Sequence, residues 1–173
     1  MALSYRKASL VDLEILTETR INVLRAANQL DADVDMSEVK KQSFEYYQNS
    51  LKNGTHLAYL IFDEETFVGA GGISYFQVMP TYHNPTGKKA YIMNMYTNPD
   101  YRRRGIAFKT LDLLVTDAKE KGITAISLEA TDMGRPLYEK YGFIKMNNEM
   151  ELPKLWKNLY KESEVWITIK KLS

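Results

Sequence analysis

The segment Asn94–Ala107 places the strongest constraint on how this chain folds. It reads NMYTNPDYRRRGIA: an apolar strand pattern stops at Asn98-Pro99, and three arginines lead into Gly105. The apolar spacing that follows predicts an amphipathic helix from Gly105 to Lys121. The unpaired N–H groups and the dipole of a helix N-terminus attract anions, and glycine lets a phosphate approach the backbone closely. The segment therefore predicts a strand, a turn and a helix that together cradle a pyrophosphate.

Two other phosphate-binding motifs are excluded by their spacing. A P-loop needs the pattern G-x-x-x-x-G-K. Gly87-Lys88 could supply its last two residues, but the position of its first glycine is occupied by Tyr82. The G-x-G-x-x-G pattern of dinucleotide-binding folds is absent from the chain. The remaining alternative to a cradle is that the three arginines form a solvated run of charge beside an ordinary helix start.

Strand and helix patterns alternate along the rest of the chain. They predict helices at 9–28, 37–53, 105–121 and 135–140, and strands at 5–8, 56–63, 66–78, 90–97, 125–130, 144–150 and 165–170. Glycines within 66–78 indicate a bend or a close approach of backbone. The order β-α-α-β-β-β-α-β-α-β-β predicts an α/β chain of the α+β type, with a mixed, mostly antiparallel sheet of six to seven strands and about four helices.

Composition narrows the class of protein. The chain has 173 residues, ordinary for one domain, so a single domain over residues 1–173 is expected. Its 23 Lys and Arg against 22 Asp and Glu give a net charge of +1, which argues against a nucleic-acid partner. It has no cysteine, and its histidines, His56 and His83, lack ligand spacing, so no metal site is expected. No apolar run is long enough for a membrane span and no secretory leader is recognisable, so a cytoplasmic protein is expected, with no membrane partner.

Two motifs resemble those of the GNAT N-acetyltransferase superfamily. Arg102-Arg103-Arg104-Gly105-Ile106-Ala107 resembles its acetyl-CoA-binding pattern, (Q/R)-x-x-G-x-(G/A), and follows Asn98-Pro99-Asp100 as is usual there. Leu137-Tyr138-Glu139-Lys140-Tyr141-Gly142-Phe143 resembles the second landmark, L-Y-x-x-x-G-F, one helix and one strand downstream. The element order matches as well, so the likeness spans nearly the whole chain, with sharp motifs only between Ala90 and Phe143. The resemblance implies a GNAT-like fold and acetyl-CoA as co-substrate.

The resemblance also implies which residues bind acetyl-CoA. In the family, the strand before the motif splays from its neighbour at a β-bulge, and the freed backbone receives the pantetheine arm and the acetyl carbonyl. The matching residues are Met95, Tyr96 and Thr97; an uninterrupted central strand, the alternative, predicts no gap beside the strand 125–130. The pyrophosphate would be held mainly by main-chain N–H groups of Arg103, Arg104, Gly105, Ile106, Ala107 and Phe108. Arg102 occupies the family's Gln/Arg position, Lys109 either reaches phosphate or is solvated, and Thr131, where many relatives carry Asn, completes the candidate set.

Catalytic roles are implied for two residues. Tyr138 matches the family's usual general acid, which protonates the leaving CoA thiolate; the alternative is a core tyrosine whose hydroxyl is satisfied. Glu129 lies on the opposite face of its strand from Ile126 and Leu128. A glutamate there acts as base in relatives that modify ribosomal-protein N-termini, and the alternative is a structural or exposed glutamate. His83, in a loop before the motif strand, is a weaker candidate for an assisting role.

The function implied is transfer of an acetyl group from acetyl-CoA to a primary amine, by direct attack in a ternary complex. The alternative is a non-catalytic acyl-CoA-binding module on the same fold. The acceptor would be a small-molecule or peptidyl amine, and the four carboxylates within residues 31–38 predict that it is cationic unless they are simply a solvated loop. The family often forms dimers, so a homodimer stays open.

Overall fold

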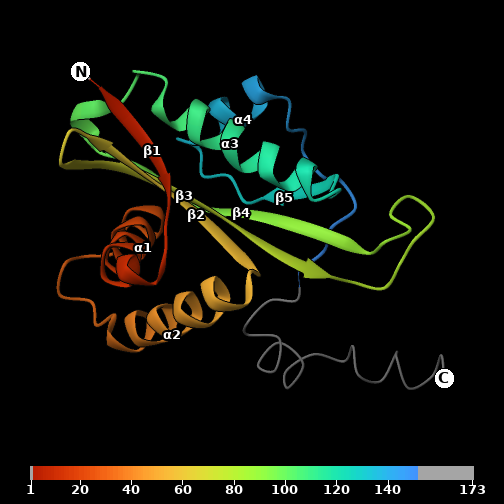
Figure 1. Ribbon diagram of the computed structural model, residues 1–173, viewed down its shortest axis with the longest axis horizontal. Helices are drawn as coiled ribbons and strands as arrows, with labels where there is room; N and C mark the ends of the chain where they lie inside the picture. The colour runs from red at the N-terminus through yellow and green to blue at the C-terminus, as the bar shows by residue number, and fades with distance from the viewer. Residues whose placement is uncertain (1, 152–173) are drawn as a thin grey trace, which may run out of the picture. The chain divides into compact units, whose positions relative to one another are not determined.

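The computed structural model describes residues 2–151, in which a five-stranded sheet carries four α-helices (Figure 1). The strands lie side by side in chain order: β1 (Leu3–Lys7), β2 (His56–Asp63), β3 (Thr66–Gln77), β4 (Lys88–Thr97) and β5 (Ala125–Leu128). Neighbouring strands from β1 to β4 are antiparallel, and β4 pairs with β5 in parallel. The helices are α1 (Leu13–Asn28), α2 (Ser37–Asn53), α3 (Ile106–Glu120) and α4 (Arg135–Tyr141), with 3-10 turns at Leu10–Asp12 and Pro99–Tyr101.

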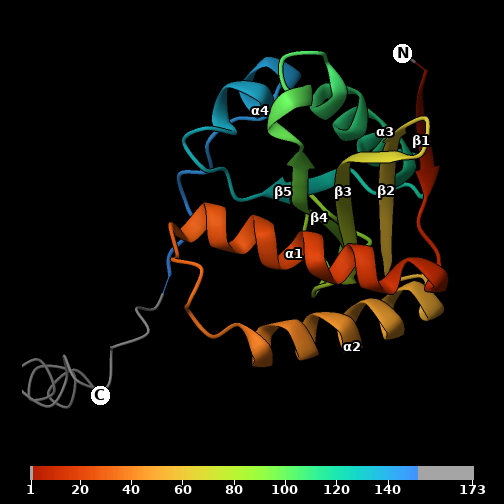
Figure 2. The same cartoon turned by 90° about the vertical axis from the view of Figure 1, so that its left-hand side faces the viewer.

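Helices cover both faces of the sheet. Figure 1 shows α1 and α2 on one face and α3 and α4 on the other, and Figure 2 shows α1 and α2 running alongside each other. Under α1 and α2, Leu16 and Tyr47 pack on a patch of small and apolar strand residues, namely Ala58, Leu60 and Ala70. Under α3, Ile106 packs with Ile61 and Val68. Alternation of side chains along β2 and β3 therefore supplies two separate apolar layers.

Most element boundaries predicted from the sequence are confirmed within a few residues, but the strand count is wrong. The described residues contain five strands, not six to seven. Residues 144–150 form no strand: Asn147 and Asn148 lie in a bend, as expected for a residue type that favours turns, and Ile144 and Met150 are exposed. The strand predicted at 165–170 lies outside the described residues. The strand predicted at 125–130 ends at Leu128, so Glu129 follows β5 instead of lying on it.

Contacts along the chain place a boundary after Gly142, with Phe143 beginning a second unit. The described part of that unit, residues 143–151, contains neither helix nor strand. A single domain over residues 1–173 therefore stays a prediction. No helix in the described residues combines the length and apolar character needed to cross a bilayer.

Candidate functional site

Strands β4 and β5 pair over only part of their length. Their register runs from Lys89 opposite Ala125 to Ile92 opposite Leu128, where β5 ends, and β4 continues alone to Thr97. Within residues 2–151, no strand pairs with Met93–Thr97 on this side. The gap that the resemblance implied beside the strand after the motif helix is therefore present, and an uninterrupted central pairing is ruled out.

A β-bulge lies on the unpaired stretch of β4. Met93 is opposite Gly72 and Tyr96 is opposite Ala70, so β4 holds one more residue than β3 between these pairs. Asn94 adopts a left-handed backbone with φ 56°, a conformation that asparagine tolerates better than most residues. The bulge was implied only by resemblance. An asparagine in the middle of this strand is the local sequence signal for the position of the bulge.

Side chains on this stretch point into the protein layers. A Cβ built on Gly71 would lie 2.7 Å from Met95 Sδ and 2.6 Å from Thr110 Cγ2, so Met95 packs under α3 at a point where only glycine fits. The ring of Tyr96 stacks on Phe67, with 6.0 Å between centroids. The Thr97 hydroxyl is buried and has no hydrogen-bond partner among the described residues. Met95 and Tyr96 therefore offer a ligand their main chain more readily than their side chains.

Residues 98–105, called the arginine turn below, connect the bulged end of β4 to α3. The Asn98 N–H donates to Val68 O at 2.8 Å, and Asn98 Oδ1 accepts from the Asp100 N–H at 3.1 Å. Arg103 and Gly105 both adopt left-handed backbone, with φ 62° and 79°, and Gly105 is the N-cap of α3. Such local reversals turn successive backbone N–H groups toward one point, which makes an anion-binding concavity. A Cβ on Gly105 would meet nothing within 4 Å, so this side of the turn is open.

Two arginine side chains brace the turn. Arg104 donates to Asp100 O at 2.9 Å and stacks 4.9 Å above the Tyr101 ring. Arg102 donates to Thr97 O at 3.4 Å. Both remain exposed, as does Arg103, so their charges lie at the surface around the start of α3.

The first turn of α3 divides into buried and exposed residues. Ile106 is fully buried in the core, so only its main chain faces the turn, while Ala107 is half-buried. Phe108 is exposed and packs on Tyr141 with 5.4 Å between ring centroids. Lys109 Nζ lies 3.9 Å from an Asp112 carboxylate oxygen and forms an ion pair at the surface. This contact agrees with the alternative that Lys109 is a solvated surface residue.

Tyr138 and Thr131 both lie at α4, but differ in burial. Tyr138 is 9% exposed, and burial raises the pKa of its hydroxyl, so the phenol stays protonated near neutral pH. Thr131 is exposed, and its hydroxyl accepts from the Gly134 N–H at 3.2 Å, which shapes the turn that opens α4. A tyrosine held in its acid form is suited to donate a proton.

Glu129 is exposed and lies beside the last part of the β4–β5 pairing. Tyr91, opposite Ser127 in that pairing, has its pKa raised by burial and then by the charge of Glu129 and a hydrogen bond with it. Ser74 is opposite Tyr91 in the β3–β4 pairing and hydrogen-bonds Tyr46 of α2, so this phenol–carboxylate pair lies on the face that α1 and α2 cover. His83 lies in the β3–β4 loop, at the other end of β4 from the bulge, with its ring against Tyr82. It is not brought to the site.

A partly buried polar cluster under α2 was not identified from the sequence. Tyr46 and Ser74 both contact His56 Nδ1, at 3.0 and 3.1 Å, and Asn94 Nδ2 donates to the Tyr47 hydroxyl at 3.1 Å. Burial lowers the pKa of His56 to about 4, so its imidazole is neutral at physiological pH. These residues come from α2, β2, β3 and β4, and no local pattern joins them.

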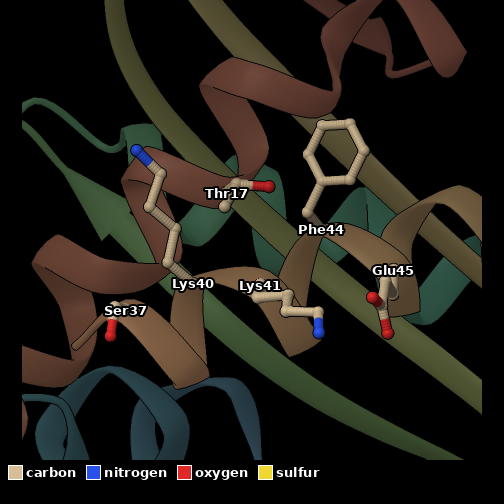
Figure 3. A pocket seen from close by; sticks show the side chains of 6 residues that line it. All are labelled: Thr17, Ser37, Lys40, Lys41, Phe44 and Glu45. Atoms are coloured by element: carbon tan, nitrogen blue, oxygen red, sulfur yellow. The ribbon is translucent and has the colours of Figure 1, made fainter.

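A separate pocket of about 370 Å³ lies between α1 and α2 (Figure 3). It is lined by Thr17, Ser37, Lys40, Lys41, Phe44 and Glu45, none of which belongs to the candidate site. Lys40 forms ion pairs with Glu18 and Glu14. No group of three or more His, Asp or Glu side chains in residues 2–151 is arranged to hold a metal ion.

Comparison with known proteins gives consistent results. A predicted acetyltransferase from Clostridium acetobutylicum, solved with acetyl-CoA, is 36% identical over 89% of this chain and 97% of its own, with a TM-score of 0.82. A GCN5-related N-acetyltransferase from Ralstonia eutropha is 24% identical over 88% of this chain and 98% of its own, with a TM-score of 0.79. A ribosomal-protein-alanine N-acetyltransferase from Brucella melitensis is 18% identical over 88% and 99%, with a TM-score of 0.62. The last two show the fold alone.

No curated protein sequence matches the chain significantly. Residues 24–143 match the acetyltransferase (GNAT) family, and this range contains the bulge, the arginine turn and Tyr138. The match covers more than half of the chain, and the solved structures share its fold over nearly all of it. The chain therefore belongs to the GNAT acetyltransferase family.

Proposed function

We propose that this protein transfers the acetyl group of acetyl-CoA to a primary amine. The observation that carries the proposal is the unpaired, bulged end of β4 lying directly before an open, arginine-flanked N-terminus of α3. The first feature suits an amide-bearing thioester arm and the second suits a pyrophosphate. The relative from Clostridium acetobutylicum was solved with acetyl-CoA, which supports the same donor here.

The donor site would be built mainly from backbone. Met95, Tyr96 and Thr97 would offer main-chain groups to the pantetheine arm, because Met95 and Tyr96 are already packed elsewhere. The diphosphate would lie against the N–H groups of the α3 start, from Arg103 to Phe108, within the positive potential of Arg102, Arg103 and Arg104. Lys109 and Thr131 would have secondary parts, because each already has a local partner.

Catalysis would rest on positioning and on the groups around the thioester. A main-chain N–H at the bulge would stabilise the negative charge that develops on the carbonyl oxygen, an effect of about 3 kcal/mol in other enzymes. Tyr138 would protonate the departing thiolate, since its raised pKa keeps the proton available. Glu129, paired with Tyr91, would take the proton of the incoming ammonium.

The acceptor would approach from the face of α1 and α2, where Glu129 and Tyr91 lie. The loop between these helices carries Asp31, Asp33 and Asp35, and Arg25 fixes its path by donating to Asp31 O and Val34 O at 2.6 and 2.8 Å. A fixed loop with three carboxylates would attract a cationic small-molecule or peptidyl amine. A cytoplasmic location and a homodimer stay predictions from the sequence.

The direct test is a screen of small amines and N-terminal peptides with acetyl-CoA, read by thiol release and by mass of the acetylated product. Transfer to at least one amine supports the proposal. Binding of acetyl-CoA without transfer to any amine would instead show an acyl-CoA-binding module.

A further inference from the structure

The bulge in β4 is tied to α2 by one buried hydrogen bond. Asn94 Nδ2 donates to the Tyr47 hydroxyl at 3.1 Å, across 47 positions of sequence. Tyr47 is 2% exposed and Asn94 is 5% exposed, so neither side chain exchanges this bond freely for water. In such surroundings a polar group that loses its partner has a large desolvation cost.

The backbone conformation of the bulge depends on this hydrogen bond, because Asn94 is itself the left-handed residue of the bulge. The Asn94 φ of 56° places one left-handed residue inside an extended strand, so the course of the backbone here depends on what holds the Asn94 side chain. Its Oδ1 is buried and finds no hydrogen-bond partner among the described residues. The hydrogen bond from Nδ2 to the Tyr47 hydroxyl is therefore what ties this side chain to the rest of the described fold.

Tyr47 is itself held firmly. Its ring meets His56 and Tyr46 edge-on, with 5.3 and 5.6 Å between ring centroids. It also belongs to the apolar cluster with Leu16 and Leu60. A ring that is packed on several sides fixes the position of its hydroxyl, so the hydrogen bond to that hydroxyl can hold the bulged stretch of β4 in one place.

We propose that Tyr47 and Asn94 are positioning residues, which hold the bulged backbone of β4 in the geometry that acetyl transfer requires. The proposal rests on the proposed function, because it assumes that the bulge receives the thioester. It adds a link between α2 and the backbone that would stabilise the oxyanion. Small displacements of such donors reduce the rate of a reaction far more than they reduce ground-state binding.

The test uses Tyr47→Phe, which removes only the hydroxyl, and Asn94→Gly, which removes the side chain but accepts positive φ. Tyr46→Phe is the matched control, because Tyr46 is the adjacent residue and bonds His56 and Ser74 instead of Asn94. For each variant and for the double variant, kcat, the Kd of acetyl-CoA, Tm and amide hydrogen exchange of residues 93–97 are measured.

We expect kcat to fall about tenfold in Tyr47→Phe and Asn94→Gly, part of the roughly 10²–10³-fold loss when an oxyanion donor is deleted. The Kd of acetyl-CoA should change by no more than about twofold, and the double variant should match the singles because they break one bond. Amides 93–97 should exchange faster in these variants and not in Tyr46→Phe.

Unchanged exchange at 93–97, unchanged kcat with a lower Tm, or effects that multiply in the double variant would each overturn the inference. If the wild type transfers acetyl to no amine while the exchange pattern holds, the proposed function fails and the positioning of the bulge stands. The exchange measurement thus separates the two failures.

Discussion

Ile92 of β4 lies opposite Leu128 of β5, and this is the last register pair between the two strands. Beyond it β4 runs on through the bulge at Asn94 and into the arginine turn, while β5 has ended. The unpaired strand end and the arginine turn are therefore consecutive in the chain. The proposed donor, with its amide-bearing arm and its diphosphate, would lie along one continuous stretch of backbone.

Gly105→Glu should abolish acetyl-CoA binding and leave the protein folded. A Cβ at Gly105 meets nothing within 4 Å, so the substitution causes no clash. Its one cost to stability is that glutamate must adopt φ 79°, which costs about 1–2 kcal/mol. The added carboxylate would stand where the phosphates bind. Isothermal calorimetry measures the affinity. Gly122→Glu is the matched control, since Gly122 also has positive φ, 70°, and open space, but at the far end of α3. Equal affinities in both variants would remove the cradle assignment.

Tyr138→Phe should lower kcat by about 10²-fold and leave the KM for acetyl-CoA nearly unchanged, because the proposed role of the hydroxyl is to protonate the thiolate as it leaves. Steady-state kinetics with the best amine measures both constants. Tyr141→Phe is the control on the same helix: its hydroxyl bonds Asp112, and its loss should leave kcat within about twofold of wild type. A fully active Tyr138→Phe would assign Tyr138 to the core alone.

Most of the fold could be predicted from the sequence, because residues at or next to the ends of the helices and strands mark where each element begins and stops. Ser37 and Gly54 bracket α2, and Gly105 and Gly122 bracket α3. The prediction of a strand at 144–150 was wrong. It rested on the spacing of apolar residues and gave no weight to Asn147-Asn148, which favour a turn. The candidate site residues came from the two motifs at 102–107 and 137–143 and from the strands beside them. Tyr47 was missed because its role depends on a contact with Asn94 that only the packing of α2 on the sheet creates.

Glu129→Gln should lower kcat/KM for the amine and flatten the rise of rate with pH, since the amide cannot accept the ammonium proton. The Kd of acetyl-CoA should not change, because Glu129 follows β5 and is not among the residues proposed to bind the donor. The pH–rate profile of kcat/KM measures this. A profile identical to that of wild type would assign the base to water or to another residue.

Asp117→Asn should remove an acid-sensitive part of the stability. Burial would raise the pKa of Asp117, but hydrogen bonds from Lys121, Tyr75 and Lys7 outweigh it and lower the pKa to about 2. A carboxyl with a lowered pKa in the folded state stabilises above its unfolded pKa, near 4, and loses that contribution as pH falls to about 2. The contribution is about 2 kcal/mol. Urea unfolding should show that the free energy of unfolding of the wild type falls by this amount between pH 4 and 2, beyond any fall in Asp117→Asn. Parallel pH dependences of the two proteins would contradict this role of Asp117.

Changing Asp31, Asp33 and Asp35 together to Asn should lower kcat/KM for a cationic amine by up to about tenfold at low salt and have little effect at high salt. Asp35 also accepts from the Ser37 N–H at 2.9 Å, and an Asn oxygen can retain that bond. Glu64→Gln with Glu65→Gln, on the β2–β3 turn, removes two negative charges away from the loop and controls for most of the change in net charge. A triple variant equal to wild type at low salt would show that the loop recruits no substrate.

Acetyl transfer from acetyl-CoA to an amine is measured most directly by following thiol release and acetylated product together across a panel of amines and peptides. We predict thiol release that depends on the amine, with one acetylated amine formed for each CoA released. We also predict that Gly105→Glu abolishes both signals. Tight binding of acetyl-CoA with no amine-dependent thiol release, across the whole panel, would contradict acetyl transfer by this protein.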